Sequence, residues 1–308
     1  MSSNVQDATD ITSPPIKVAM CQVYTEQWAL EDNLRRTLAA LNEAADLGAD
    51  LAITPECVLH GYGDKNGDFE ERMRAAAVPL NGKAIGSVRE TAKARALDVV
   101  IGFAEAKPDG GFANSDAVAK PSSGFANTAA LVTRDGEIAC VYRKVHCRGF
   151  EDATRDGLFS PGDEFYVVDY TGHGGRNRLG LMICFDREVP ESVRCLRALG
   201  AEIIACPLAT DTTDMANHGN CANNEMITRI RAAENEVFIV VVNHAGRFNG
   251  GSFAVGPGGE VIEQMGADPG VEVLELPVGV VPEKYHSKPL GWMGWGYRRP
   301  AVYDRYLR

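Results

Sequence analysis

The segment 180–191, GLMICFDREVPE, constrains the fold more than any other part of the chain. Its apolar start predicts a buried strand that ends at Ile183, and Cys184 follows directly. Pro190 and Glu191 then open an amphipathic stretch; proline is favoured in the first turn of a helix, and an acidic residue there suits the helix dipole. The segment therefore predicts a strand–cysteine–helix elbow, with a thiol at the sheet edge where α/β proteins bind ligands.

One cysteine in such a run is more often inert packing than a nucleophile, because free cysteine is among the most buried residue types. No pair is spaced as CxxC, so a zinc site would need scattered ligands. Several lie in apolar runs, as reduced core cysteines do, which favours a cytoplasmic protein. The eight cysteines are Cys21, Cys57, Cys140, Cys147, Cys184, Cys195, Cys206 and Cys221.

Composition excludes two classes of partner. The net charge of −11, from 31 basic and 42 acidic residues, leaves no excess of positive charge for phosphate, so nucleic acid is not expected. No apolar run reaches the length of a membrane span, and the polar start of the chain lacks the apolar core of a signal peptide. We therefore predict a cytoplasmic protein without a membrane partner.

The first half of the chain alternates strand and helix. Apolar runs predict strands at 16–23, 51–53 and 99–104, and helical periodicity predicts helices at 28–47 and 82–97. This βαβαβ pattern is typical of α/β layers.

The second half adds hairpins to the pattern. Asp135–Gly136 is a strong hairpin turn, and two glycine-rich turns predict two more hairpins. The predicted elements are a hairpin of 127–133 with 137–145, a hairpin of 165–170 with 178–183, a helix at 192–199, a strand at 202–206, a helix at 220–235, a strand at 237–243, a hairpin of 251–255 with 260–265, and a closing strand at 271–276.

Three regions follow from this pattern. Residues 1–15 are predicted to be a disordered lead-in, and residues 16–276 form the folded domain. Residues 277–308, rich in proline and aromatic residues, are predicted to form an arm at a subunit interface. Within the domain, a strand ends at Glu56 and another at Cys184, so two strand–helix halves are expected to face each other across one crevice.

Glu56, Lys144 and Cys184 each follow an apolar strand, and their chemistry is complementary. A thiol with a pKa near ~8.5 is a poor nucleophile at neutral pH until a base or a cation favours the thiolate. A carboxylate can take the proton and return it to a leaving amine, and an ammonium can stabilise the oxyanion of a tetrahedral intermediate. Together the three residues predict acyl transfer without histidine.

The motifs around these residues resemble those of the nitrilase superfamily of carbon–nitrogen hydrolases. The resemblance covers about residues 16–276 and follows the family's order. Its motifs are Thr54–Pro55–Glu56, Tyr142–Arg143–Lys144–Val145–His146, the run from Cys184 to Glu191, Arg231–Ala232–Ala233–Glu234–Asn235, Asn243, and Asn249–Gly250–Gly251–Ser252.

The resemblance implies a four-layer αββα sandwich, usually paired through its helices into a dimer, so a homodimer or a larger homo-oligomer is expected. It implies Glu56 as general base, Lys144 as oxyanion stabiliser and Cys184 as nucleophile, with the backbone N–H of Phe185 as second oxyanion donor. No cofactor and no metal are expected.

Many members carry a second glutamate after the lysine, which orients it. Glu151 is the best candidate here, and Asp152 and Asp156 are rivals. His60 and Tyr62, just after the base, are expected to line the pocket or to be structural.

The residues after the cysteine bear on the substrate. Nitrile-cleaving members tend to have Cys–Trp–Glu, whereas this chain has Cys–Phe–Asp, which resembles small-amide hydrolases and carbamoylases. Carbamoylases hold a substrate carboxylate with two successive arginines; here Arg187 matches the first, and Glu188 replaces the second. Arg187 is therefore either a substrate contact or the partner of a structural ion pair with Asp186, Glu188 or Glu191.

We predict hydrolysis of a small neutral or cationic amide, with Arg187 and Asn243 among the substrate-binding residues. An N-carbamoyl amino acid is the alternative substrate, and a nitrile is a weaker one. A thiol hydrolase using His146, His218 or His244, and a catalytically silent interaction protein on the same fold, also remain open.

Overall fold

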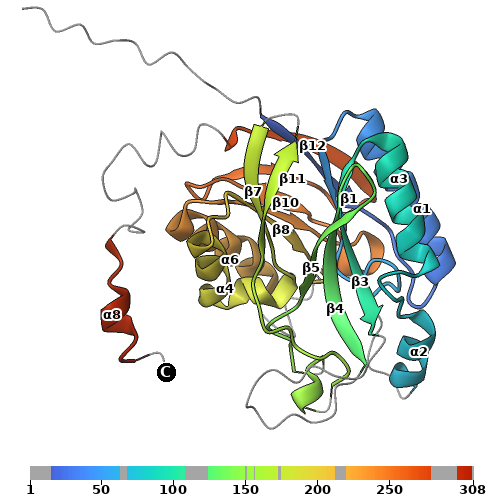
Figure 1. Cartoon of the computed structure of the whole chain (residues 1–308), viewed down its shortest axis with the longest axis horizontal. Coiled ribbons are helices and arrows are strands. Elements are labelled where there is room, and N and C mark those ends of the chain that lie inside the picture. The colour runs from blue at the N-terminus through green and yellow to red at the C-terminus, as the bar shows by residue number, and fades with distance from the viewer. Residues whose placement is uncertain are drawn as a thin grey trace, which may run out of the picture.

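Two six-stranded sheets face each other and form the centre of the molecule (Figure 1). The structure is a computed structural model that describes residues 15–62, 68–107, 124–149, 151–155, 157–172, 175–211, 220–278 and 297–306. Their backbones give the element bounds below. The predicted lead-in, apart from residue 15, lies outside these ranges, as do His218 and Asp156.

The first sheet has the order β12-β1-β2-β3-β4-β5. Strands β1, β2 and β3 are parallel, and β4 and β5 continue the sheet antiparallel. The last strand returns to pair antiparallel with the first, so Ile16 is opposite Leu276. The strands are β1 (Ile16–Gln22), β2 (Leu51–Ile53), β3 (Asp98–Ala106), β4 (Phe125–Val132), β5 (Ile138–Arg143) and β12 (Gly270–Leu276).

The second sheet has the order β11-β10-β9-β8-β7-β6 and the same plan. Strands β7, β8 and β9 are parallel, and β6, β10 and β11 flank them antiparallel. The three predicted hairpins are therefore confirmed as β4–β5, β6–β7 and β10–β11. The strands are β6 (Val167–Gly172), β7 (Gly175–Leu181), β8 (Ile203–Pro207), β9 (Phe238–Val242), β10 (Phe253–Val255) and β11 (Val261–Gln264).

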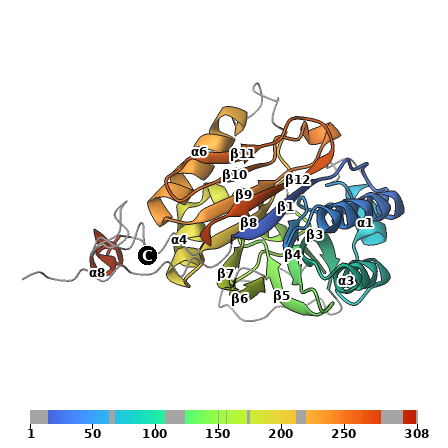
Figure 2. The same cartoon turned by 90° about the horizontal axis from the view of Figure 1, so that it is seen from above.

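Helices cover the outer faces of both sheets, which gives the four layers seen in Figure 2. Helices α1 (Leu30–Asp46) and α3 (Lys83–Arg95) pack on the first sheet, and α4 (Pro190–Ala198) and α6 (Asn220–Asn235) cover the second. The predicted αββα sandwich is confirmed. Sequence periodicity missed the short helix α2 (Phe69–Ala76), whose buried residues are only Met73 and Ala76.

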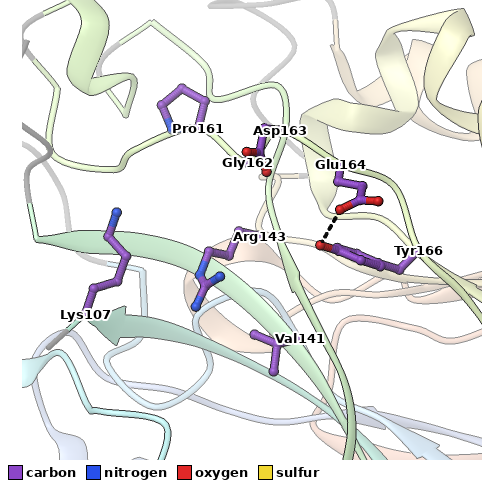
Figure 3. Close-up of a pocket in the computed structure, with 8 residues that line it drawn as sticks. All are labelled: Lys107, Val141, Arg143, Pro161, Gly162, Asp163, Glu164 and Tyr166. Atoms are coloured by element: carbon purple, nitrogen blue, oxygen red, sulfur yellow. Dashed lines mark hydrogen bonds between the residues drawn. The ribbon is translucent and has the colours of Figure 1, made fainter. Parts of the chain in front are cut away.

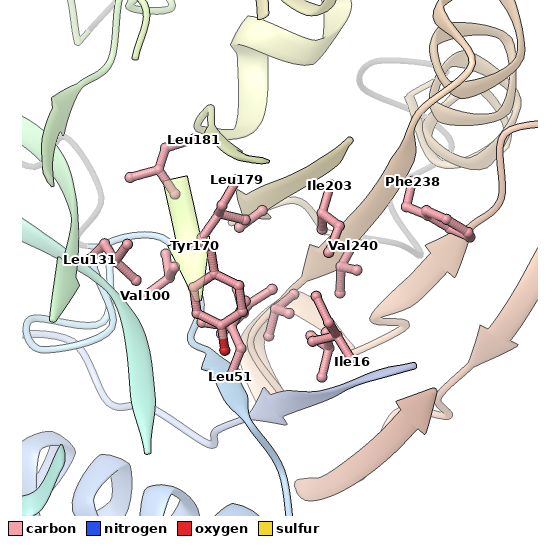
Figure 4. Packing of buried hydrophobic residues seen from close by; sticks show 14 of the residues in the cluster. Ile16, Leu51, Val100, Leu131, Tyr170, Leu179, Leu181, Ile203, Phe238 and Val240 are labelled. Atoms are coloured by element: carbon pink, nitrogen blue, oxygen red, sulfur yellow. The ribbon is translucent and has the colours of Figure 1, made fainter. Parts of the chain in front are cut away.

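Apolar side chains from the inner faces of both sheets fill the space between them (Figure 4). Leu51 and Val100 come from the first sheet, and Leu179, Ile203 and Val240 come from the second. Each fully buried side chain of this kind contributes roughly 1.5–3 kcal/mol. This layer therefore holds the two sheets together, and with them the strand ends that carry the predicted triad.

Gly102 of β3 lets this strand approach the segment that carries Glu56. A Cβ at this position would lie 2.3 Å from the carbonyl oxygen of Pro55 and 3.1 Å from the Cα of Glu56. The Gly102 N–H donates to Thr54 Oγ1, and its carbonyl accepts from the Val58 N–H. The strand and the turn after β2 are thus in backbone contact.

We expect Gly102→Ala to lower the free energy of unfolding by about 1–3 kcal/mol, because the added methyl group collides with backbone atoms. Chemical denaturation measures the loss. Gly86→Ala is the matched control: Gly86 is in helix α3, and its Cβ would meet nothing within 4 Å. This control is expected to keep or gain stability, by up to about 1 kcal/mol. Equal stabilities for wild type and Gly102→Ala would contradict the close approach.

Of the predicted C-terminal arm, the structure describes residues 277–278 and 297–306, which include α8 (Pro300–Tyr303). Its position at a subunit interface stays a prediction.

Candidate active site

A buried cluster of charged side chains lies at the C-terminal ends of strands β2 and β5. The ammonium nitrogen of Lys144, directly after β5, is 2.7 Å from Glu56 Oε1 and 2.8 Å from Glu151 Oε2. All three side chains are at most 1% exposed. One ammonium thus faces two carboxylates, and the sequence-predicted base and lysine are in direct contact.

Two neutral side chains complete the cluster. Asn127 of β4 donates to Glu56 Oε1 at 2.6 Å and lies 3.3 Å from Glu151 Oε1. The Tyr62 hydroxyl donates to Glu151 Oε1 at 2.7 Å. The second oxygen of Glu56, Oε2, is buried and has no hydrogen-bond partner. Among the described residues, this oxygen therefore has room to accept a proton.

Burial and charge tune this cluster for proton transfer. Burial raises the pKa of Glu56. The ammonium of Lys144 opposes this effect, and the negative charge of Glu151 adds to it. Burial acts against the charged form of Lys144, but Glu151 and Glu56 outweigh it and hold the pKa of Lys144 well above its usual value. The raised pKa of Glu56 suits a carboxylate that takes up and returns a proton, while Lys144 stays charged.

Cys184 begins the turn that follows β7, where the polypeptide enters the second helical layer. Its φ angle is +46°, in the left-handed region that residues other than glycine seldom adopt. A short 3₁₀ helix, η2 (Cys184–Glu188), leads from it to α4. This strained turn is the predicted strand–cysteine–helix elbow, with a tighter turn inserted before the helix.

The environment of the thiol favours its neutral form at rest. Burial raises the pKa of Cys184, and the carboxylate of Glu56 raises it further. The positive charges of Lys144 and Arg187 oppose these effects. Cys184 is therefore within electrostatic range of the Glu56–Lys144 pair, and the thiol needs a base to become a nucleophile.

Asp186 fixes the elbow against the first sheet. Its Oδ2 accepts hydrogen bonds from the Ile183 N–H at 3.0 Å and the Tyr142 hydroxyl at 2.6 Å. Its Oδ1 accepts from the His146 N–H at 2.8 Å. Because Tyr142 and His146 flank Lys144 in the sequence, this buried carboxylate sets the elbow relative to the lysine.

A small pocket lies on the other side of the strand end that carries Lys144 (Figure 3). Its volume is about 30 Å³, the room of a single water molecule, so it cannot hold a substrate. The Arg143 guanidinium in its wall binds both oxygens of Glu105, at 2.7 and 2.8 Å. The Gly162 N–H donates to the Lys144 carbonyl at 2.8 Å. These contacts fix the backbone at Lys144.

Comparison with known proteins identifies the family. The model of the family described as carbon-nitrogen hydrolase matches residues 17–283. The chain belongs to this family. An (R)-stereoselective amidase from Pseudomonas sp is 33% identical over 267 residues, which are 85% of each chain. The deaminated glutathione amidase of Mus musculus is 26% identical over 93% of this chain and 84% of its own.

Solved structures of a carbon–nitrogen hydrolase relative agree with this assignment. The amidase from Nesterenkonia sp. superposes with a TM-score of 0.71 at 25% identity, over 97% of this chain and 98% of that chain. A variant of the same amidase, with acrylamide added at the active-site cysteine, has a TM-score of 0.72 at 25% identity, over 95% and 100% of the two chains.

Of the two described candidates for the second glutamate of the family, Glu151 and Asp152, Glu151 is in contact with Lys144. A Cβ on Gly157 would lie 2.3 Å from the Glu151 carbonyl carbon, so the following loop closes tightly on it. The Asp152 carboxylate instead accepts from the N–H and hydroxyl of Thr154.

The remaining predicted substrate residues differ in their surroundings. Tyr62 contacts Glu151 and so supports the charged cluster. The buried His60 ring lies 5.6 Å from the Trp28 ring, both its nitrogens lack hydrogen-bond partners, and burial lowers its pKa to about 4. Phe185 is in η2 directly after Cys184, where an oxyanion donor is expected. Substrate contact by His60 and an oxyanion role for Phe185 stay predictions.

Asn243, which is predicted to bind substrate, has an amide that already binds the backbone, and its substrate role stays a prediction. Its Oδ1 accepts from the Thr210 N–H at 3.1 Å, and its Nδ2 donates to the carbonyls of Thr210 and Gly250 at 2.8 and 2.7 Å. Asn243 is fully buried. It therefore positions the loops after β8 and β9 rather than presenting a free polar group.

The ion-pair interpretation of Arg187 is wrong for the described residues. The guanidinium is 1% exposed, and its Nε and Nη1 have no hydrogen-bond partner. Asp186 binds Tyr142 and His146 instead. Because a buried charge without a partner is costly, Arg187 is available to an anionic or polar group.

Neither of the two described histidines of the alternative thiol mechanism binds the Cys184 thiol. His244 Nε2 donates to the Glu56 carbonyl at 2.7 Å, and its Nδ1 accepts from the Thr25 hydroxyl. Burial lowers the pKa of His244 to about 3, so the ring is neutral. His146 binds Asp186.

The described residues contain no group of three or more His, Cys, Asp or Glu side chains arranged to hold a metal ion. None of the described helices is both long and apolar enough to cross a membrane.

Proposed function

We propose that the protein hydrolyses the carbon–nitrogen bond of a small linear amide through a Cys184 thioester, with Glu56 as base and Lys144 as oxyanion stabiliser. The buried contact of Lys144 with Glu56, beside the strained Cys184 elbow, carries the proposal. The amidase relatives, and the acrylamide adduct on the cysteine of one of them, support amide chemistry at an active-site cysteine.

The first half of the reaction forms the acyl-enzyme. Glu56 takes the thiol proton of Cys184 as its sulfur attacks the amide carbon. The oxyanion that forms is stabilised by the Lys144 ammonium and the Phe185 N–H. When the intermediate collapses, Glu56 returns the proton to the leaving nitrogen, and ammonia or an amine departs from the thioester.

The second half releases the acid. Glu56 takes a proton from water, whose oxygen attacks the thioester carbon, and the same donors hold the oxyanion. Collapse of this intermediate breaks the carbon–sulfur bond and the proton returns to the sulfur. Glu151, Asn127 and Tyr62 keep the lysine and the base in place throughout.

A substrate panel tests this function. Ammonia release is measured from nitriles, aliphatic amides, amino-acid amides and N-carbamoyl compounds, with Cys184→Ala as the blank. We expect release from uncharged small amides and little from nitriles. Folded wild-type protein that releases ammonia from none of them would favour the silent interaction protein.

A second candidate function is hydrolysis of N-carbamoyl amino acids or other amides with a carboxylate. The buried Arg187 guanidinium, with Nε and Nη1 unpartnered, favours it, because a carboxylate can accept both N–H groups. Glu188 is half-buried next to it. We infer that its negative charge opposes an anionic substrate, so the uncharged amide remains the first candidate.

The ratio of kcat/KM for an uncharged amide and its N-carbamoyl amino-acid counterpart separates these candidates. We expect wild type to prefer the uncharged amide, and Glu188→Arg to shift the ratio toward the anion by about tenfold, the range of a hydrogen bond to a charged group. Glu188→Gln, which removes only the charge, should shift it less. A wild-type preference for the anion that disappears in Arg187→Met would establish the second candidate.

We also propose that the protein is a homodimer paired through its helical layer. Exposed apolar side chains on α6 support this: Met226 is 51% exposed and Ile230, one turn later, is 48% exposed.

A further inference from the structure

Residues 208–210, directly after β8, run between the base and the nucleophile. The Leu208 carbonyl accepts the Glu56 N–H at 3.3 Å, and the Leu208 N–H donates to the Val242 carbonyl at 2.8 Å. Two residues later, the hydroxyl oxygen of Thr210 is 3.8 Å from the sulfur of Cys184. The same three-residue stretch therefore touches the backbone of the base and the reacting atom of the nucleophile.

The backbone of Thr210 is held rigidly in this place. The Asn243 amide binds both its N–H and its carbonyl, at 3.1 and 2.8 Å. Asn243 is itself fixed, because its N–H donates to the Ser252 hydroxyl at 2.9 Å and its Nδ2 donates to the Gly250 carbonyl. Two loops of the second sheet thus aim one hydroxyl at the sulfur.

The sulfur needs such a donor, because the ammonium of Lys144 is fully used at rest. Its three hydrogens face three acceptors: Glu56 Oε1 at 2.7 Å, Glu151 Oε2 at 2.8 Å and Glu151 Oε1 at 3.1 Å. Lys144 therefore acts on the thiol through its charge and not through a hydrogen bond. Burial and the carboxylates meanwhile hold the pKa of Cys184 above its ordinary value.

We propose that Thr210 is a further catalytic residue, whose hydroxyl donates a hydrogen bond to the Cys184 sulfur as Glu56 removes the thiol proton. The proton of the thiol goes to Glu56, and the hydroxyl keeps its own. The bond is lost when the sulfur forms its bond to the substrate carbon. The catalytic use of this contact rests on the amidase function proposed above.

The experiment compares Thr210→Val, which keeps the shape and removes the hydroxyl, with Thr210→Ser, which keeps the hydroxyl. Alkylation of Cys184 by iodoacetamide is followed against pH on the peptide that contains it, and kcat/KM is measured on an uncharged amide. Thr37→Val is the matched control, because it removes a buried hydroxyl that binds only the Asn33 carbonyl in helix α1.

We expect Thr210→Val to move the alkylation midpoint upward by about one pH unit and to lower kcat/KM about 10- to 100-fold, mainly in kcat. Thr210→Ser should stay within about threefold of wild type, and Thr37→Val should match wild type in both measurements. Thermal unfolding confirms that the variants fold.

Three results would overturn the proposal. An unchanged pH profile of alkylation in Thr210→Val would show that the hydroxyl donates no hydrogen bond to the thiolate. A lower midpoint would show that the hydroxyl accepts from the thiol and opposes ionisation. Equal losses of kcat/KM in Thr210→Ser and Thr210→Val would show that the effect comes from side-chain packing and not from the hydroxyl. Because alkylation needs no amide substrate, these outcomes are distinct from a failure of the proposed amidase function.

Discussion

Cys184→Ala is expected to abolish amide hydrolysis, with a loss of roughly 10⁴- to 10⁶-fold in kcat, the range seen when a covalent nucleophile is removed. No other described side chain takes part in the proposed bond to the substrate carbon. Because alanine is smaller and keeps the same backbone, the variant should unfold at nearly the wild-type temperature. Ammonia release and thermal unfolding together measure the two effects.

Cys195→Ala is the matched control for this experiment. Cys195 is an exposed cysteine of helix α4, and its variant should keep wild-type activity. Cys206→Ala should also stay active, but it is the less clean control, because Cys206 is fully buried in strand β8. Substantial amide turnover by Cys184→Ala would contradict the proposed covalent mechanism.

Lys144→Met should lose at least ~10²–10³-fold in kcat, because removal of a single oxyanion donor typically lowers the rate by that factor. The variant also loses the positive charge that favours the thiolate. It should be less stable by about 3–5 kcal/mol, since removing one partner leaves buried carboxylates uncompensated. Lys93→Met, on the surface helix α3, is the control for loss of a lysine.

The stability loss in Lys144→Met should depend on pH. Burial already raises the pKa of Glu56 above 4.5, and without the ammonium it rises further. A carboxyl whose folded-state pKa is raised stabilises the fold below its unfolded pKa and loses that contribution as pH rises toward the folded value. The difference from wild type should therefore be small near pH 4 and larger at neutral pH. Near-normal turnover, or a pH-independent difference, would contradict the buried cluster.

The three residues of the proposed triad could be selected from the sequence because each lies within three residues of the end of an apolar strand. Local patterns predict strand β2 of the first sheet, strand β7 of the second sheet and the hairpin β4–β5. The three residues lie at or just beyond the ends of these elements. The sandwich also follows from local signals, since alternating strands and helices must bury one face each.

The contacts inside the site depend on tertiary structure and could not be read from the sequence in the same way. Arg187 and Asp186 are neighbours in sequence, but the carboxylate turns to Tyr142 and His146 across the sheets, and Nε and Nη1 of Arg187 have no hydrogen-bond partner among the described residues. The contact of the Asn243 amide with the backbone of Thr210, 33 residues earlier in the chain, was likewise not readable from the sequence.

Other site residues were missed although a signal was present. Asn127 is a buried amide within the otherwise apolar strand β4, and such a group must have partners. Its partners, Glu56 and Glu151, are the charged groups of the site. A polar residue inside a buried strand was thus a pointer to the buried charged cluster.

Mass spectrometry of the protein mixed with a slow amide substrate tests the central claim most directly. The account predicts a mass increase equal to the acyl group on the peptide that contains Cys184, absent in Cys184→Ala and lost with time as water hydrolyses the thioester. An adduct on another residue would contradict the account. So would turnover of that amide without any adduct after a rapid acid quench, provided that deacylation is slow enough for a thioester to accumulate.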